Sequence, residues 1–79
     1  MNDERLRKCF VEALGVRSEV VTDTLAYNSI KQWDSVGHMA LVAALETEFN
    51  VMLSTDDIIA MSSLAVVRTI LLKHGISFP

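Results

Sequence analysis

The sequence is short of the residues that most often reinforce small proteins. Cys9 is the only cysteine, so no disulfide can form within the chain and nothing requires an oxidising compartment. The two histidines, His38 and His74, lie far apart in the sequence and no cysteine pair accompanies them, so no structural metal site is predicted. The core must therefore depend on the packing of side chains alone.

Proline is also scarce. The only proline is the last residue, and hydrophobic residues make up 51% of the 79 positions. This composition argues against a disordered chain and favours tightly packed helices in a single domain over residues 1–79. The sequence shows no transmembrane run and no signal peptide, so we expect a cytoplasmic protein that does not insert into membranes.

Basic residues are missing from the middle of the chain. There is no lysine or arginine between Lys31 and Arg68, whereas several acidic residues fall in this interval. They are Asp34, Glu46, Glu48, Asp56 and Asp57. The acidic middle and the net charge of -3 disfavour nucleic acid as a partner and favour proteins with basic patches. We expect the protein to be a monomer.

The first helix is predicted from its apolar spacing and its ends. Asn2 or Asp3 can cap its start, and Gly15 supplies the left-handed position that ends it. Its apolar residues recur with a helical period and comprise Leu6, Phe10, Ala13 and Leu14. Residues 15–34 show no such period, and they form a connection that is unusually long for a compact domain.

Irregularly spaced apolar residues lie in this long segment. They are Val20, Val21, Leu25, Tyr27, Ile30 and Trp33. Either a short extra helix is hidden here, or buried anchors order a loop. The irregular spacing favours an anchored loop, with one helical turn around residues 22–26 and with Trp33 as the last anchor.

The segment Ser35–Phe49 has the pattern of a second helix. Asp34 or Ser35 can cap its start, because either side-chain oxygen can accept a free N–H of the first turn, and Asn50 can end it. An apolar stripe of mixed three- and four-residue steps runs along it. The stripe comprises Val36, Leu41, Val42, Leu45 and Phe49.

Two further helices are predicted after the second. Ser54 and Asp57 have the spacing of a capping box at the start of a helix that can only be short. Ser62 or Ser63 caps a fourth helix, which Gly75 closes. The inward residues of that helix are Leu64, Val67, Ile70 and Leu71. The predicted fold is therefore all-α: a four-helix bundle with three main helices, a short third helix and a long loop between the first two.

The most informative string runs from Trp33 to Phe49. It resembles the signature of the acyl carrier protein family, in which Asp-Ser-Leu opens the second helix and Leu, Leu-Glu and Phe follow at set distances. The matching positions here are Asp34, Ser35, Leu41, Leu45, Glu46 and Phe49. The chain length and the helix layout also match, so the resemblance extends over nearly the whole chain.

The resemblance implies a carrier protein that has no catalytic activity of its own. In that family a phosphopantetheinyl transferase attaches 4′-phosphopantetheine from coenzyme A to the serine, here Ser35, and the terminal thiol carries acyl groups as thioesters. The first turn of a helix suits the added phosphate, because its N–H groups and dipole favour anions. Asp34 is expected to help hold a magnesium ion during attachment. The other partners are expected to be an acyl-loading ligase or acyltransferase and downstream synthase enzymes.

The second helix departs from the commonest family pattern. Val36 replaces leucine, Ala40 stands where a carboxylate is often found, and Gly37, His38 and Met39 are uncharged. These differences favour a specialised biosynthetic pathway over general fatty acid synthesis. The docking surface is expected to be partly apolar and partly acidic, with both glutamates facing outward. Its residues are Val36, Met39, Glu46, Glu48 and Asp56.

An acyl chain is expected to enter the bundle between the second and third helices. The residues predicted to contact it are Leu45, Ile59 and Met61. The short third helix is expected to move most easily, and the flexible methionine side chain can adapt to the acyl chain. Two alternatives remain open. The chain can instead be a peptidyl, aminoacyl or aryl carrier, which also uses Ser35, or a structural subunit that keeps the fold without the modification.

The remaining reactive side chains are predicted to have structural roles. His38 pairs with no acid or cysteine as a catalytic set, and we expect it to be a solvated surface histidine. Cys9 lies one turn from Leu6 and is expected to be a small buried hydrophobe. His74 is expected to interact with the dipole at the end of the fourth helix.

Overall fold

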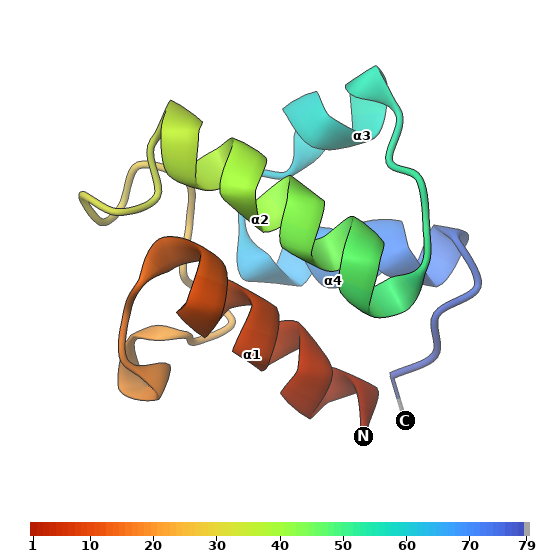
Figure 1. Ribbon diagram of the computed structural model, residues 1–79, viewed down its shortest axis with the longest axis horizontal. Helices are drawn as coiled ribbons and strands as arrows, with labels where there is room; N and C mark the ends of the chain where they lie inside the picture. The colour runs from red at the N-terminus through yellow and green to blue at the C-terminus, as the bar shows by residue number, and fades with distance from the viewer. Residues whose placement is uncertain (79) are drawn as a thin grey trace.

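The computed structural model describes residues 1–78, and over this range it contains four α-helices and one 3₁₀ turn. In chain order they are α1 (Asn2–Leu14), η1 (Ser18–Val20), α2 (Ser35–Phe49), α3 (Thr55–Ala60) and α4 (Leu64–Lys73). α1 and α2 lie side by side and run in opposite directions, α4 lies behind them, and the short α3 lies at one edge (Figure 1). The predicted all-helical bundle is confirmed. No helix in the described part combines the length and apolar character that crossing a membrane requires.

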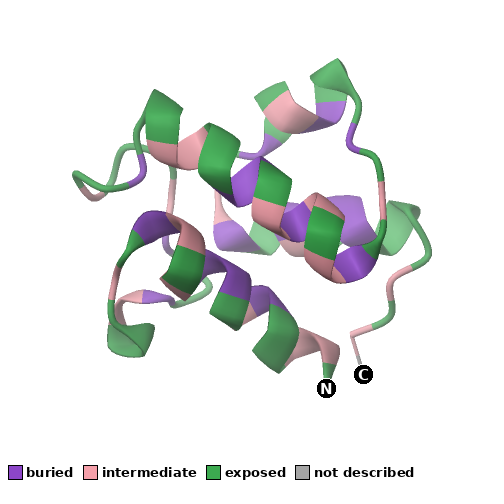
Figure 2. Ribbon diagram, in the orientation of Figure 1, coloured by how far each residue is buried: buried purple, intermediate pink, exposed green. Residues whose placement is uncertain are grey.

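The core forms where α1, α2 and α4 face one another, and their buried faces point inward (Figure 2). The three helices supply the buried residues Leu6, Phe10, Leu14, Leu41, Val42, Leu45, Phe49, Leu64, Val67, Ile70 and Leu71. The predicted stripes are therefore confirmed except at Ala13, which is only partly buried, and at Val36, which is 78% exposed. Val36 precedes Leu41 by five residues, and at about 100° per residue it points away from the buried side.

The long connection between α1 and α2 is an anchored loop, as predicted. Val21, Leu25 and Trp33 are buried, and the edge of the Trp33 ring packs against Phe10 with the centroids 5.2 Å apart. Tyr27 was expected to be another anchor but is 39% exposed. Buried aliphatic and aromatic groups thus fix a segment that has almost no regular structure.

The helical turn predicted around residues 22–26 is present only as a single hydrogen-bonded turn, in which Leu25 donates its N–H to the Thr22 carbonyl at 3.0 Å. The 3₁₀ turn lies earlier, at Ser18–Val20, and Leu25 enters an extended stretch that pairs with the connection between α3 and α4. There Leu64 donates its N–H to the Leu25 carbonyl, and Tyr27 donates its N–H to the Ser62 carbonyl, both at 2.9 Å. These tertiary hydrogen bonds satisfy backbone groups that a local helical turn would otherwise have used.

The helix ends follow local chemistry with one exception. Gly15 and Asn50 end α1 and α2 in left-handed conformations, with φ of 66° and 52°, as predicted. α1, however, begins at Asn2, so neither Asn2 nor Asp3 caps it. The Asn2 amide donates instead to the Ser77 carbonyl at 2.8 Å, which ties the start of the chain to the segment after α4.

α3 and α4 begin with the predicted serine caps. Ser54 accepts from the Asp57 N–H at 3.0 Å and Asp57 accepts from the Ser54 N–H at 3.3 Å, so the capping box is confirmed. Ser63 rather than Ser62 caps α4, and Gly75 follows that helix with a φ of 86°. His74 is the C-cap residue of α4, and its Nε2 lies 2.8 Å from Asp57 Oδ2. The hydrogen bond from His74, followed by those from Ser54, lowers the pKa of Asp57 to about 2.

Candidate functional site

The start of α2 separates the roles of two adjacent side chains. Asp34 is the N-cap, because its backbone is extended and its Oδ1 accepts from the Gly37 N–H at 2.9 Å. Ser35 is the first residue of the helix and is exposed. The sequence left open which of the two caps the helix, and the structure assigns that role to Asp34. Within residues 1–78 the Ser35 hydroxyl makes no hydrogen bond, so it is available for chemistry.

The surroundings of Ser35 favour a negative charge. The first N–H groups of a helix have no intrahelical partner and form the positive end of its dipole, which stabilises an anion placed there. One Asp34 oxygen is used in the cap, which leaves the other oxygen free to meet a cation. In the described residues no three His, Cys, Asp or Glu side chains converge as metal ligands, so Asp34 can supply only one ligand of a shared magnesium ion.

Gly37 holds the preceding loop against the first turn of α2. A Cβ at this position would overlap the Gln32 carbonyl and would lie 3.1 Å from Leu14 Cδ2. Glycine normally weakens a helix, and the close approach of the loop backbone explains why a glycine is present at this position. From the sequence Gly37 is only an uncharged residue of the docking turn. Its structural role is to let the loop lie tightly beside the turn that carries Ser35.

His38 is not a solvated surface residue, and that prediction is wrong. The Trp33 indole N–H donates to His38 Nδ1 at 2.9 Å, and His38 Nε2 lies 2.8 Å from the Ile58 carbonyl. The His38 ring also stacks on Trp33 with an angle of 18° between the planes, and it meets Tyr27 nearly edge to face. The signal in the sequence was Trp33 itself, since a buried indole needs an acceptor and His38 lies one turn into the next helix.

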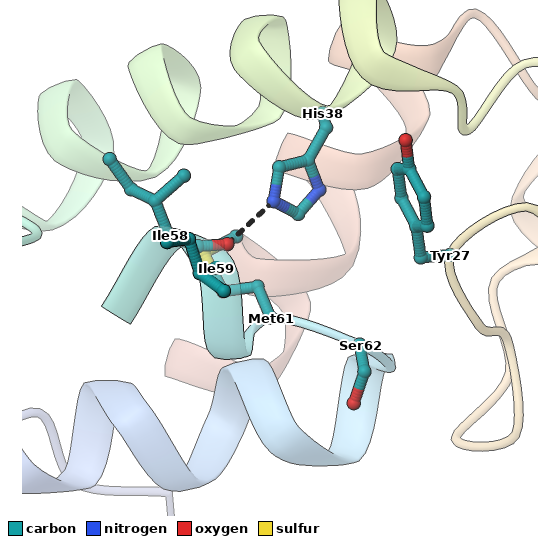
Figure 3. Close-up of a pocket in the computed structure, with 6 residues that line it drawn as sticks. All are labelled: Tyr27, His38, Ile58, Ile59, Met61 and Ser62. Atoms are coloured by element: carbon teal, nitrogen blue, oxygen red, sulfur yellow. Dashed lines mark hydrogen bonds between the residues drawn. The ribbon is translucent and has the colours of Figure 1, made fainter. Parts of the chain in front are cut away.

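A pocket of about 270 Å³ opens between the start of α2, α3 and the long loop (Figure 3). It is lined by Tyr27, His38, Ile58, Ile59, Met61 and Ser62. His38 follows Ser35 by three residues, so the pocket and the serine lie on the same side of α2. The lining combines apolar side chains with the rings of Tyr27 and His38.

Two of the three predicted pocket residues line this cavity. Ile59 is 77% exposed at its rim, and Met61 is almost completely buried. Leu45 does not line it, because it is fully buried in the core. Leu45 lies seven residues beyond His38, which places it about 10 Å further along α2. The sequence does not indicate Tyr27 and Ser62 as lining residues, because only the pairing of the loop with the α3–α4 connection brings them to the pocket.

The predicted docking residues differ in whether their side chains are exposed or paired within the protein. Val36 and Met39 are exposed, lie three residues apart in the first turns of α2, and form an apolar surface beside Ser35. Asp56 is exposed on α3.

The two glutamates were expected to face outward, but each is half-buried and has an internal partner. Glu46 accepts the Leu53 N–H at 2.9 Å, which fixes the connection between α2 and α3. Glu48 pairs with Arg5 at 2.7 Å, and the hydrogen bond from Arg5 lowers the pKa of Glu48. The surface nearest Ser35 is therefore apolar, and much of the acidic charge further along α2 is already paired.

Cys9 is buried, as predicted, and is chemically inert. Burial, followed by the nearby charge of Glu48, raises its pKa to about 11, so the thiolate is scarce at neutral pH. Cys9 is therefore a poor nucleophile at neutral pH.

Comparison of the chain with models of known protein families and with curated protein sequences finds no match. The function is therefore inferred from the environment of Ser35, the adjoining pocket, and the resemblance of the string from Trp33 to Phe49.

Proposed function

We propose that this protein carries acyl groups as thioesters on a 4′-phosphopantetheine arm attached to Ser35. The observation that carries the proposal is the division of roles at the start of α2. Asp34 caps the helix, and Ser35 therefore presents an exposed, unpaired hydroxyl at the positive end of the dipole. A serine needed as the cap would lose that role on modification. Here modification of Ser35 leaves the Asp34 cap in place.

Attachment uses Ser35 Oγ as the nucleophile. A base of the phosphopantetheinyl transferase takes the hydroxyl proton, a bond forms from Oγ to the phosphorus of the pantetheine phosphate in coenzyme A, and the adenosine bisphosphate leaves. The free N–H groups of the first turn stabilise the resulting phosphodiester. The free oxygen of Asp34 provides one ligand to the magnesium ion, and the phosphates and the transferase provide the rest.

The pocket beside α3 is proposed to shelter the cargo. For scale, a dry cavity of about 150 Å³ holds one benzene molecule, so about 270 Å³ accommodates a chain of roughly ten carbons at most. Ile58, Ile59 and Met61 provide apolar walls, and each buried methylene contributes about 0.8 kcal/mol. Met61 is flexible and polarizable, so it can adapt to chains of different length.

Partner enzymes are proposed to dock on Val36 and Met39, with Asp56 at the edge. These partners are the transferase, an acyl-loading ligase or acyltransferase, and the synthase enzymes of a specialised pathway in the cytoplasm. An apolar centre beside the attachment site supports contacts that persist at high salt, because screening acts only on charges. We therefore expect salt to weaken docking less than an acidic surface alone would predict.

Attachment is tested by incubating the protein with coenzyme A, magnesium and a transferase of broad specificity. One arm should be added, at Ser35 only, as located by peptide mass spectrometry. Ser35→Ala should remain folded and unmodified, and the control Ser18→Ala, which removes another exposed serine, should accept the arm normally. An arm attached elsewhere would contradict the proposal, and a failure to attach any arm would favour the structural-subunit alternative.

The polar lining of the pocket supports a second candidate, a carrier of aryl or aminoacyl groups. Tyr27 and His38 place a phenol ring and an imidazole beside a cavity whose other side chains are mostly apolar. Such a lining suits a ring or a polar acyl group better than it suits a plain alkyl chain. Comparing the melting temperatures of proteins loaded with alkyl and aryl cargoes of equal carbon number distinguishes the two candidates, because the better-fitting cargo stabilises more.

A further inference from the structure

His38 connects the fixed core of the bundle to the helix that borders the pocket. The connection is a chain of two hydrogen bonds, from the Trp33 indole to His38 and from His38 to the Ile58 carbonyl, which we call the His38 bridge. Figure 3 shows the second bond crossing from α2 to α3 at the pocket wall. We infer that the His38 bridge holds α3 against α2, so that an acyl chain enters more deeply between the two helices only when it is long enough to break the bridge.

The core side of the bridge is rigid. Trp33 is fully buried and packed against Phe10, so its indole N–H has a fixed position. An indole is only a donor, and His38 Nδ1 must therefore accept. The proton of the neutral imidazole then lies on Nε2, which donates to the Ile58 carbonyl. Tyr27 contacts both Trp33 and the His38 ring from the loop side. Together with the Trp33 hydrogen bond, these contacts fix the direction of the His38 Nε2 donor.

On the α3 side, the bridge adds to the packing of Ile58 and of the buried Met61 that follows the helix. α3 has six residues, which is too short for a helix to be stable alone. Its first turn is tied to α4 through the contact between Asp57 and His74. The next residue, Ile58, is linked to α2 by the bridge, and Ile59 after it is exposed. Breaking the bridge would therefore remove the hydrogen bond from α3 to α2 while the contact with His74 stays.

The geometry couples this motion to the cargo. His38 and Ile58 both line the pocket, so a chain that penetrates between α2 and α3 separates them and leaves a carbonyl and an N–H without partners. Short alkyl chains bury too few methylenes to offset that loss, whereas longer chains bury enough. His38 is thus a positioning residue that sets a threshold of chain length. This consequence depends on the proposed carrier function, but the closed state of α3 does not.

Three substitutions separate the two hydrogen bonds from simple packing. His38→Gln places an amide nitrogen near the position of Nε2 and keeps a donor for Ile58. His38→Asn keeps an acceptor for Trp33 but is too short to reach Ile58. His38→Phe keeps the ring volume and the stacking without either hydrogen bond.

The first readout is amide hydrogen exchange in the unmodified protein, comparing residues 55–61 with α1 and α4. His38→Asn and His38→Phe should speed exchange in residues 55–61 by about fivefold, the effect of losing one average hydrogen bond, and leave α1 and α4 unchanged. His38→Gln should stay close to the original protein. Equal exchange in the Phe and Gln variants, or an equal change in all helices, would overturn the inference.

The second readout uses the protein with the arm on Ser35, loaded with acyl chains of two to ten carbons. The original protein should gain heat resistance only above a threshold length, and His38→Phe should gain it from shorter chains. Identical thresholds would also overturn the inference. Failure of Ser35 to accept the arm would instead remove the proposed function and leave the exchange result to decide on the His38 bridge.

Discussion

Two parts of this small bundle are held together in different ways. α1, α2 and α4 share one apolar core, in which Leu6, Leu41 and Leu71 have no exposed surface. α3 contributes only the partly buried Ile58 to that core, and polar contacts of two adjacent residues attach it, Asp57 with His74 and Ile58 with His38. Apolar burial is non-directional and resists opening, whereas single hydrogen bonds can be exchanged one at a time. The comparison explains why the pocket lies beside α3.

The strongest test of this comparison is a pair of aliphatic truncations. Leu45→Ala should lower the free energy of unfolding by about 2–5 kcal/mol, because it opens a cavity in the core. Ile59→Ala should lower it by less than about 0.5 kcal/mol, since Ile59 is 77% exposed. Urea denaturation measures both values. Similar losses in the two variants would show that α3 belongs to the same packed unit as the other helices.

The second prediction concerns the packing of the loop against the first turn of α2. Gly37→Ala should destabilise the protein by about 1–3 kcal/mol, because the added methyl group overlaps the Gln32 carbonyl. Helix propensity alone predicts the opposite, a gain of up to about 1 kcal/mol. Thermal unfolding separates the two outcomes, with the exposed Ala43→Ser as the control. A stabilised Gly37→Ala variant would show that the loop does not lie as tightly against the helix as described.

The division of roles between Asp34 and Ser35 predicts a smaller difference. Asp34→Ala should cost about 1 kcal/mol, because it removes the acceptor for the Gly37 N–H. Ser35→Ala should change the free energy of unfolding by no more than a few tenths of a kcal/mol, since its hydroxyl caps nothing. Chemical denaturation of both variants under the same conditions decides. A larger loss for Ser35→Ala would reverse the assignment of the cap.

The polar attachment of α3 should be visible in acid. The folded-state pKa of Asp57 is lowered to about 2, below the value of about 4 for an unfolded chain. A lowered carboxyl pKa stabilises the fold above the unfolded value, and this stabilisation is lost as the pH falls from about 4 through about 2. Asp57→Asn should therefore show a weaker loss of stability in this window than the control Asp56→Asn, by circular dichroism during acid titration. Equal curves would show that the contacts of Asp57 do not stabilise the fold above about pH 4.

Most of the fold was predictable from the sequence, because the signals that define the helices are local. The periodic stripes of α1 and α4, the left-handed Gly15 and the capping box of Ser54 and Asp57 each involve residues within a few positions of one another. Val36 was assigned to the stripe of α2 from its apolar character, although its rotation about the helix axis places it on the outer side.

The parts of the candidate site that were missed depend on contacts between distant segments. His38 was expected in solvent because its partner Ile58 lies twenty positions further along the chain. The pocket was predicted to reach Leu45, which shares the face of α2 with His38 but lies about 10 Å further along the helix. The role of Gly37 depends on a carbonyl from the loop, and no spacing rule predicts such an approach. Side-chain type alone could not reveal these three-dimensional relations.

The most direct test of the carrier function is the intact mass of the protein purified from its own cells, followed by fragmentation to locate any added group. The account predicts a mass that exceeds the sequence by one phosphopantetheine, with or without an acyl group, and places the addition on Ser35. The acyl mass would identify the cargo at the same time. An unmodified chain, in cells whose other carrier proteins bear the arm, would contradict the account.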